Sequence, residues 1–119
     1  MENYSLAPRK SAHVIGEVPF LSKDEVVIAT GQLANATVLG KKDDGTFIQL
    51  DVADDATEAT AAVAVLFGGV NASDAPAPGL AHARLTAVDA SKLVWPEGIT
   101  EPQKAAAIVE LAALHIITR

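Results

Sequence analysis

The apolar and polar positions of this chain change their pattern twice along its length. From residue 25 onward, short apolar runs at 26–29, 36–39, 46–50 and 61–67 are separated by turn residues. Short runs rich in β-branched and aromatic residues, bounded by turn residues, are typical of strands. The chain beyond residue 24 therefore predicts a β-rich domain.

Turn residues divide this region at two further points. The segment 40–45 contains an Asp-Gly step, which tolerates positive φ and predicts a hairpin between the runs on either side. The segment 71–79 carries two prolines and a glycine among small polar residues, so it predicts a loop. Alternation resumes at 81–88 and predicts one continuous strand. Its expected shared face carries His82, Arg84 and Thr86.

The C-terminal region has a helical pattern instead. Thr100 can accept a hydrogen bond from the first turn, Gln103 can reach back to the cap, and Pro102 lies where a missing donor costs least. These residues predict a helix over 101–114. The β-branched residues 116–118 then predict either a final strand or a tail packed on the sheet. The apolar face expected to be buried consists of Ile108, Leu111 and Ala112, with Val109 and Ala113 beside it.

No period holds across the first 24 residues. They mix prolines, basic residues and glycine with one apolar patch between Val14 and Leu21. A frayed terminus would have this composition. So would an arm that becomes ordered on a partner, adding a short strand around Val14 and Ile15 to an exposed sheet edge. Composition alone leaves both interpretations open.

Length and composition predict one domain with a thin core. The chain has 119 residues, and half of them are apolar, but alanine and valine dominate this set. Only three Phe, one Tyr and one Trp can supply large buried side chains. Because a thin core is often completed by burying surface between subunits, we expect an oligomer.

Charge and cysteine usage narrow the classes of partner. Fifteen acidic residues against nine basic ones give a net charge of −6, which repels phosphate backbones and anionic lipids. We therefore expect no nucleic-acid and no membrane partner. The sequence has no cysteine, no secretory pattern at its start and no apolar stretch near the ~20 residues of a membrane span. These features predict a protein that needs no disulfides and is not exported by a signal peptide.

Candidate chemistry is sparse. The three histidines are far apart in sequence, and we expect a structural or surface role for each rather than metal binding. An acidic cluster lacks the glycine and the ligand order of a calcium loop, so it predicts a solvated loop. No nucleophile elbow and no glycine-rich phosphate loop occurs. We therefore predict no enzyme, no catalytic residues, no cofactor and no metal. The acidic cluster is Asp51, Asp54, Asp55 and Glu58.

The C-terminal run LVWPEGITEPQKAAAIVELAALHIITR, from Leu93 to Arg119, resembles the C-terminal signature of lambda-type head decoration proteins of tailed bacteriophages. Its central feature is a Trp-Pro-Glu step followed by a capped, alanine-rich helix. Upstream pieces fit the family in order and spacing, so the resemblance covers about residues 22–119. These pieces are 26–33, 37–41, 44–47 and 62–66.

The resemblance implies a mainly β fold with a C-terminal helix, of the β-clip type, in a homotrimer. Such proteins bind the major capsid protein on the outer surface of the expanded head, at threefold positions. They are not enzymes, and they stabilise the head against the pressure of packaged DNA. The implied location is the outer surface of the virion, with the host cytoplasm as the site of assembly.

The resemblance also assigns roles to residues. It implies a flexible capsid-binding arm at 1–24 and a single decoration domain at 25–119. The predicted capsid-binding residues are Val14, Ile15, Val18, Pro19, Phe20 and Leu21. The predicted anchors of the fold or trimer are Trp95, Pro96, Ile108 and Leu111. His115 stands where the family usually has glycine at the helix end, so we predict positive φ there.

Two other functions share some of these features. A trimeric β-clip nucleotide hydrolase of the dUTPase type would have similar size and β content, but its nucleotide and Mg²⁺ motifs are not found here. An adhesion module on the head surface, binding host glycans or proteins, is compatible with decoration. Nucleotide titration and pull-downs against capsid or host material discriminate among the three.

Overall fold

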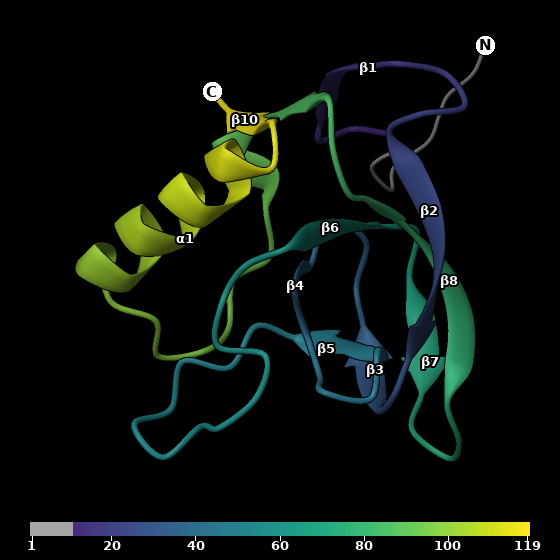
Figure 1. Cartoon of the computed structure of the whole chain (residues 1–119), viewed down its shortest axis with the longest axis vertical. Coiled ribbons are helices and arrows are strands. Elements are labelled where there is room, and N and C mark those ends of the chain that lie inside the picture. The colour runs from purple at the N-terminus through teal and green to yellow at the C-terminus, as the bar shows by residue number, and fades with distance from the viewer. Residues whose placement is uncertain (1–10) are drawn as a thin grey trace, which may run out of the picture.

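The computed structural model describes residues 11–119, and residues 1–10 of the predicted arm lie outside this range. The described chain contains a closed β-barrel, two small sheets and one α-helix packed beside the barrel (Figure 1). The prediction of a mainly β fold with a C-terminal helix is confirmed. In barrel order, the strands are β2 (Lys23–Ile28), β5 (Phe47–Gln49), β4 (Val38–Lys41), β6 (Ala64–Phe67) and β8 (Ala77–His82).

The barrel strands pair antiparallel except where β2 meets β5. β2 and β8 run antiparallel along their whole length, while a single parallel pair, Ile28 with Phe47, joins β2 to β5. The predicted hairpin is confirmed, because β4 and β5 pair antiparallel across the Asp-Gly turn. Gly45 has φ of 91° and donates its N–H to the Lys42 carbonyl at 3.0 Å. Glycine adopts this backbone conformation without the steric cost of a side chain.

A three-stranded sheet brings the two ends of the described chain together. β9 (Thr86–Val88) lies in the middle, β1 (Val14–Glu17) pairs antiparallel with it, and β10 (Ile116–Thr118) pairs parallel with its other edge. The predicted final strand is thus confirmed. The remaining elements are β3 (Gly31–Leu33), its partner β7 (Val70–Ala72) and the short 3-10 helix η1 (Ala90–Lys92).

Two predictions around β8 are wrong. Residues 81–88 do not form one strand, because β8 ends at His82 and Leu85 turns the chain with φ of 52° before β9 begins. The segment 71–79 is not wholly a loop, because its last residues start β8. Pro78 lies in the part of β8 that pairs with β2 but not with β6, which covers only Leu80–His82.

The helix α1 (Glu101–Ala113) begins at the predicted cap. Thr100 Oγ1 accepts from the Gln103 N–H at 3.3 Å, and Gln103 Oε1 accepts from the Thr100 N–H at 2.9 Å. Because this capping box satisfies two donors that a helix start leaves unpaired, it fixes the first turn. His115 has φ of 63°, as predicted, and reverses the chain into β10.

The predicted buried face of α1 is only partly right. Ala107 and Leu111, four residues apart, are the buried residues of the helix, and Ile108 is partly buried. The helix lies on the outside of the barrel (Figure 1). Its buried residues, Ala107 and Leu111, belong to the first core cluster and form one narrow stripe. A narrow stripe covers one i, i+4 row and leaves neighbouring positions in solvent. Ala112 was wrongly expected on the buried face, and it is exposed, as are Val109 and Ala113 beside it.

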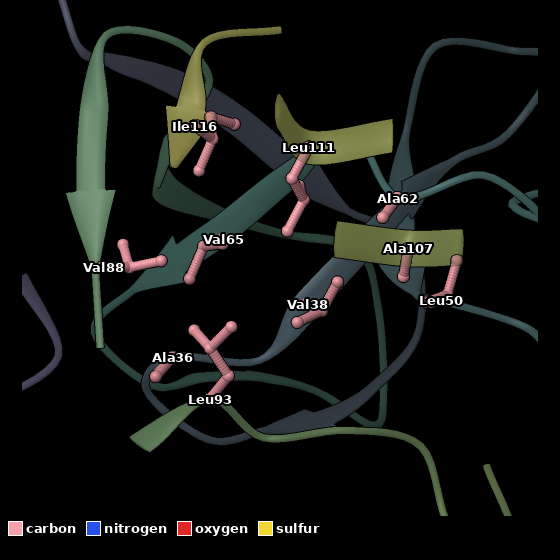
Figure 2. Close-up of a cluster of buried hydrophobic side chains, with 10 residues drawn as sticks. All are labelled: Ala36, Val38, Leu50, Ala62, Val65, Val88, Leu93, Ala107, Leu111 and Ile116. Atoms are coloured by element: carbon pink, nitrogen blue, oxygen red, sulfur yellow. The ribbon is translucent and has the colours of Figure 1, made fainter. Parts of the chain in front are cut away.

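Two apolar clusters form the core of the described chain. In the first, Leu111 of α1 and Ile116 of β10 pack with barrel residues Val38 and Val65 (Figure 2). The second fills the barrel around Ile28. The buried apolar residues are aliphatic, so the core is built from small side chains as the composition predicts. Besides Ile28, the second cluster contains Val26, Leu39, Ala64, Leu66, Ala72 and Ala81.

Candidate functional site

A tight turn joins β1 to β2 and carries most of the predicted binding residues. The Leu21 N–H donates to the Val18 carbonyl at 3.1 Å, which closes a four-residue turn with Pro19 and Phe20 at its centre. Proline suits the first central position because its φ is already fixed. Phe20 takes the second position with φ of 68°, where glycine is the usual residue. The backbone thus projects a large aromatic side chain from a strained position.

Polar contacts, of which those of Ser22 are the most buried, hold this turn in place. Ser22 is fully buried, and its Oγ accepts from the Val18 N–H and donates to the Leu85 carbonyl, both at 2.8 Å. The Arg84 guanidinium donates to the Leu21 carbonyl at 2.7 Å and pairs in bidentate fashion with Asp24. This pairing lowers the pKa of Asp24 below its ordinary value. The turn is therefore fixed to the barrel from both ends.

The turn presents its apolar side chains to solvent. Phe20 is fully exposed, with a relative exposure of 103%, and Leu21 and Val18 are also exposed. Val18 borders a shallow depression of about 380 Å³, which is also lined by Leu85 and Ile117. Clustered exposed apolar residues mark interaction sites on proteins. We define the apolar turn surface as Ile15, Val18, Phe20, Leu21, Leu85 and Ile117, all of them exposed.

The structure separates the predicted binding residues into two groups. Val14 is partly buried and pairs with Val88, so it belongs to the sheet rather than to the exposed surface. Pro19 is exposed at the turn. The strand expected around Val14 and Ile15 forms on β9 of the same chain, and the sheet order leaves β1 at an edge. Residues 11–24 are therefore part of the folded domain's sheet and barrel, and no structural boundary falls at residue 24.

A cluster of His13, Glu17 and His82, which the sequence does not reveal, joins β1 to β8. His13 and His82, which are 69 positions apart, are both buried with ring centroids 6.1 Å apart. His82 Nε2 lies 2.7 Å from Glu17 Oε1, and this hydrogen bond is the main cause that lowers the pKa of Glu17. Of the structural or surface positions that we expected, both histidines take a buried one, and their contact depends on the fold. No short-range spacing could have indicated it.

The predicted anchors of the fold occupy different depths. Leu111 is fully buried, Pro96 is buried, and Trp95 and Ile108 are partly buried. Trp95 packs against the first core cluster, with Lys104 Nζ 6.0 Å from the centre of its ring. Leu111 and Trp95 therefore contact the first core cluster, whereas the anchoring roles of Pro96 and Ile108 stay predictions. The role of all four residues in a trimer stays a prediction.

The acidic residues gather at another part of the molecule, between the loop 51–60 and the start of α1. Asp51, Asp54 and Glu97 line an open pocket of about 610 Å³ there. Across residues 11–119, no group of three or more acidic, histidine or cysteine side chains is arranged to hold a metal. The helix of the described chain does not have the length and apolar character needed to cross a bilayer.

Comparison with known proteins identifies one family. The sequence model of bacteriophage lambda head decoration protein D matches residues 7–116, which includes the apolar turn surface except Ile117, as well as the capped helix. No curated protein and no solved structure matches the chain. A head decoration protein is a structural component of the virion capsid. Since the match spans most of its length, the chain belongs to the bacteriophage lambda head decoration protein D family.

Proposed function

We propose that this protein binds as a homotrimer to the outer surface of the expanded phage head at threefold positions. There it contacts the major capsid protein and stabilises the shell against the pressure of packaged DNA. The observation that supports this proposal is the apolar turn surface, where Phe20 is fully exposed and the turn is fixed by buried hydrogen bonds. Family membership supports the choice of the capsid as its partner.

Rigidity makes the apolar turn surface suitable for binding. Phe20 and Leu21 are already held in one backbone arrangement, so binding does not have to order a mobile loop around them. Preorganisation of this kind lowers the entropic cost of association. Aromatic side chains that enter pockets on a partner often provide most of the binding energy of an interface. We therefore assign Phe20 the central contact with the capsid protein.

The trimer supplies the remaining affinity. One trimer carries three identical turn surfaces. After the first has bound the capsid, the second and third bind at a high effective concentration. Weak single contacts then give tight binding to a lattice with matching threefold geometry. Binding that favours the expanded shell over its precursor stabilises the expanded state by the difference in affinity. Sedimentation of the free protein should give three times the 12.3-kDa subunit mass. A stable monomer would contradict this part of the proposal.

Cosedimentation with expanded heads prepared without the protein tests the binding surface. Deleting residues 1–21 would also remove β1 and the buried His13, so substitutions are the cleaner test. The double variant Phe20→Gly with Leu21→Ser should bind about tenfold more weakly or worse. Val109→Ser is the matched control, because Val109 is an exposed apolar residue of α1 with 68% exposure. Equal binding by wild type and the double variant would refute the assignment.

A further inference from the structure

The histidine cluster beneath β1 is built from four elements. His13 directly precedes β1, and its ring lies 6.1 Å from His82 of β8 and 6.3 Å from Phe67 of β6, measured between centroids. Phe67 and His82 meet edge to face at 5.3 Å. Lys23 of β2 places its Nζ 4.3 Å from the centre of the Phe67 ring. The imidazole of His13 is thus enclosed, with 1% of the residue exposed.

Hydrogen bonding in this cluster is unequal. Glu17 Oε1 accepts from His82 Nε2 at 2.7 Å and is also 3.7 Å from Lys23 Nζ. An ionised carboxylate can only accept, so His82 carries its proton on Nε2. In contrast, neither ring nitrogen of His13 has a hydrogen-bond partner among the described residues. Burying a neutral imidazole without hydrogen-bond partners costs free energy. Burying an imidazolium, which has two N–H donors and a charge, costs far more.

The charges around His13 also oppose a second positive charge. Lys23 faces the cluster from β2, and Lys92 of η1 lines the same small pocket as His13. His82 approaches from β8. The anion of the cluster is Glu17 on β1, and its carboxylate is already engaged by His82 and Lys23. Among residues 11–119, an imidazolium at His13 would therefore lie in a buried site whose nearby carboxylate is already engaged by other cations.

We propose that His13 is a proton-sensitive latch: its neutral ring holds β1 against β9 and the barrel, and its protonation releases β1. The position of His13 couples the ring to the strand. Its carbonyl accepts from the Asp89 N–H at 2.8 Å, and the next residue, Val14, is the first to pair with β9. When the ring moves out to reach water, these pairings are lost with it.

The direction of the pH effect follows from the burial of His13. Burial, and then the nearby His82, lower the pKa of His13 below its ordinary value of 6.5. The released state therefore binds more protons than the docked state, so docking weakens as pH falls below 6.5. The pKa of Glu17 is also lowered, so its protonation weakens docking too, but only below its ordinary value of 4.5. Between pH 6.5 and pH 4.5, the weakening of docking therefore reports on histidine rather than on Glu17.

One consequence concerns the apolar turn surface. Val18 follows β1 directly and is tied to Ser22 and, through it, to Leu85. Release of β1 would loosen this turn and weaken any contact made by Phe20. This consequence rests on the proposed function, whereas the latch does not.

Hydrogen exchange of the free protein tests the latch. Exchange of the Val14–Glu17 amides, corrected for the intrinsic effect of pH, should show an open population that rises by up to about tenfold per pH unit below 6.5. His13→Phe keeps a ring in the cluster but cannot be protonated, so its β1 opening should not change between pH 6.5 and 5.5. His115→Asn is the control, because it removes an exposed histidine where asparagine tolerates positive φ. It should behave like wild type.

A pH-independent opening of β1 in wild type, or an unchanged pH response in His13→Phe, would overturn the proposal. NMR titration of the wild-type imidazoles provides a test that needs no variant. The His13 resonance should titrate with a midpoint below 6.5, together with the loss of the β1 amide signals. Titration at the ordinary value with β1 intact would also overturn it. Neither measurement uses heads, so failure of the latch is distinct from failure of the proposed function.

Discussion

The N-terminal segment 11–22 and the C-terminal segment 93–119 place strands on opposite edges of the same strand, β9, but they use their apolar residues in opposite ways. The C-terminal segment buries a stripe of them against the barrel (Figure 2). The N-terminal segment exposes them at a turn. The buried set is Leu93, Ala107, Leu111 and Ile116, and the exposed set is Ile15, Val18, Phe20 and Leu21.

This contrast shows that backbone geometry, rather than hydrophobicity, assigns the two segments their roles. In α1, residues four apart face the same side and reach the core together. At the turn, the positive φ of Phe20 directs its side chain away from the barrel. Substitutions at the exposed turn of the first segment should therefore change binding, and substitutions in the buried stripe of the second segment should change stability.

The largest effect is expected at Leu111. Leu111→Ala leaves a cavity in the fully buried first cluster, so the free energy of unfolding should fall by about 2–5 kcal/mol. Denaturant unfolding measures this loss, with Leu114→Ala as an exposed control at the helix end. A loss below about 1 kcal/mol would mean that the C-terminal stripe does not hold the fold.

Trp95 should give the next largest effect. Trp95→Ala removes a half-buried ring that packs on the same cluster, so we expect a loss of about 2 kcal/mol, less than for a fully buried tryptophan. Thermal melting should show a clearly lower midpoint. A melting curve like that of wild type would refute its role as an anchor of the fold or trimer.

A smaller effect is expected at the helix cap. Thr100→Ala removes the acceptor for the Gln103 N–H and half of the capping box, which should cost about 1 kcal/mol. Unfolding in urea resolves a change of this size. Thr57→Ala, at an exposed position of the acidic loop, should leave stability unchanged. Equal losses in both variants would contradict the assignment.

The smallest effect on stability is expected at Phe20. Phe20→Gly relieves the positive φ but adds backbone freedom to the unfolded chain, so stability should stay within about 0.5 kcal/mol of wild type. Unfolding in urea, measured beside head binding, tests whether the two properties separate. A variant that loses stability as well as binding would show that Phe20 belongs to the core after all.

Local signals predicted much of the fold. The cap at Thr100 and the hairpin at Gly45 each depend on residues close together in sequence. The positive φ at His115 was predicted from the resemblance to the family, which usually has glycine there. The break between β8 and β9 could not be predicted, because Leu85 has no intrinsic preference for positive φ. Closure of the barrel by one pair of residues depends likewise on distant packing.

The candidate site was predicted only in part. The apolar patch between Val14 and Leu21 is visible in the sequence, and the structure shows which of its members face solvent. Pairing of β1 with β9 and the meeting of His13 with His82 join residues more than 65 positions apart. Such contacts leave no periodic trace in one sequence.

The most direct test of the account is hydroxyl-radical footprinting of wild-type protein, free and bound to expanded heads. Fully exposed Phe20 and its neighbour Leu21 should be labelled strongly in the free protein and protected on heads. Val109, exposed on α1, should be labelled equally in both states. Protection of Val109 with Phe20 still labelled would contradict the claim that the apolar turn surface meets the capsid.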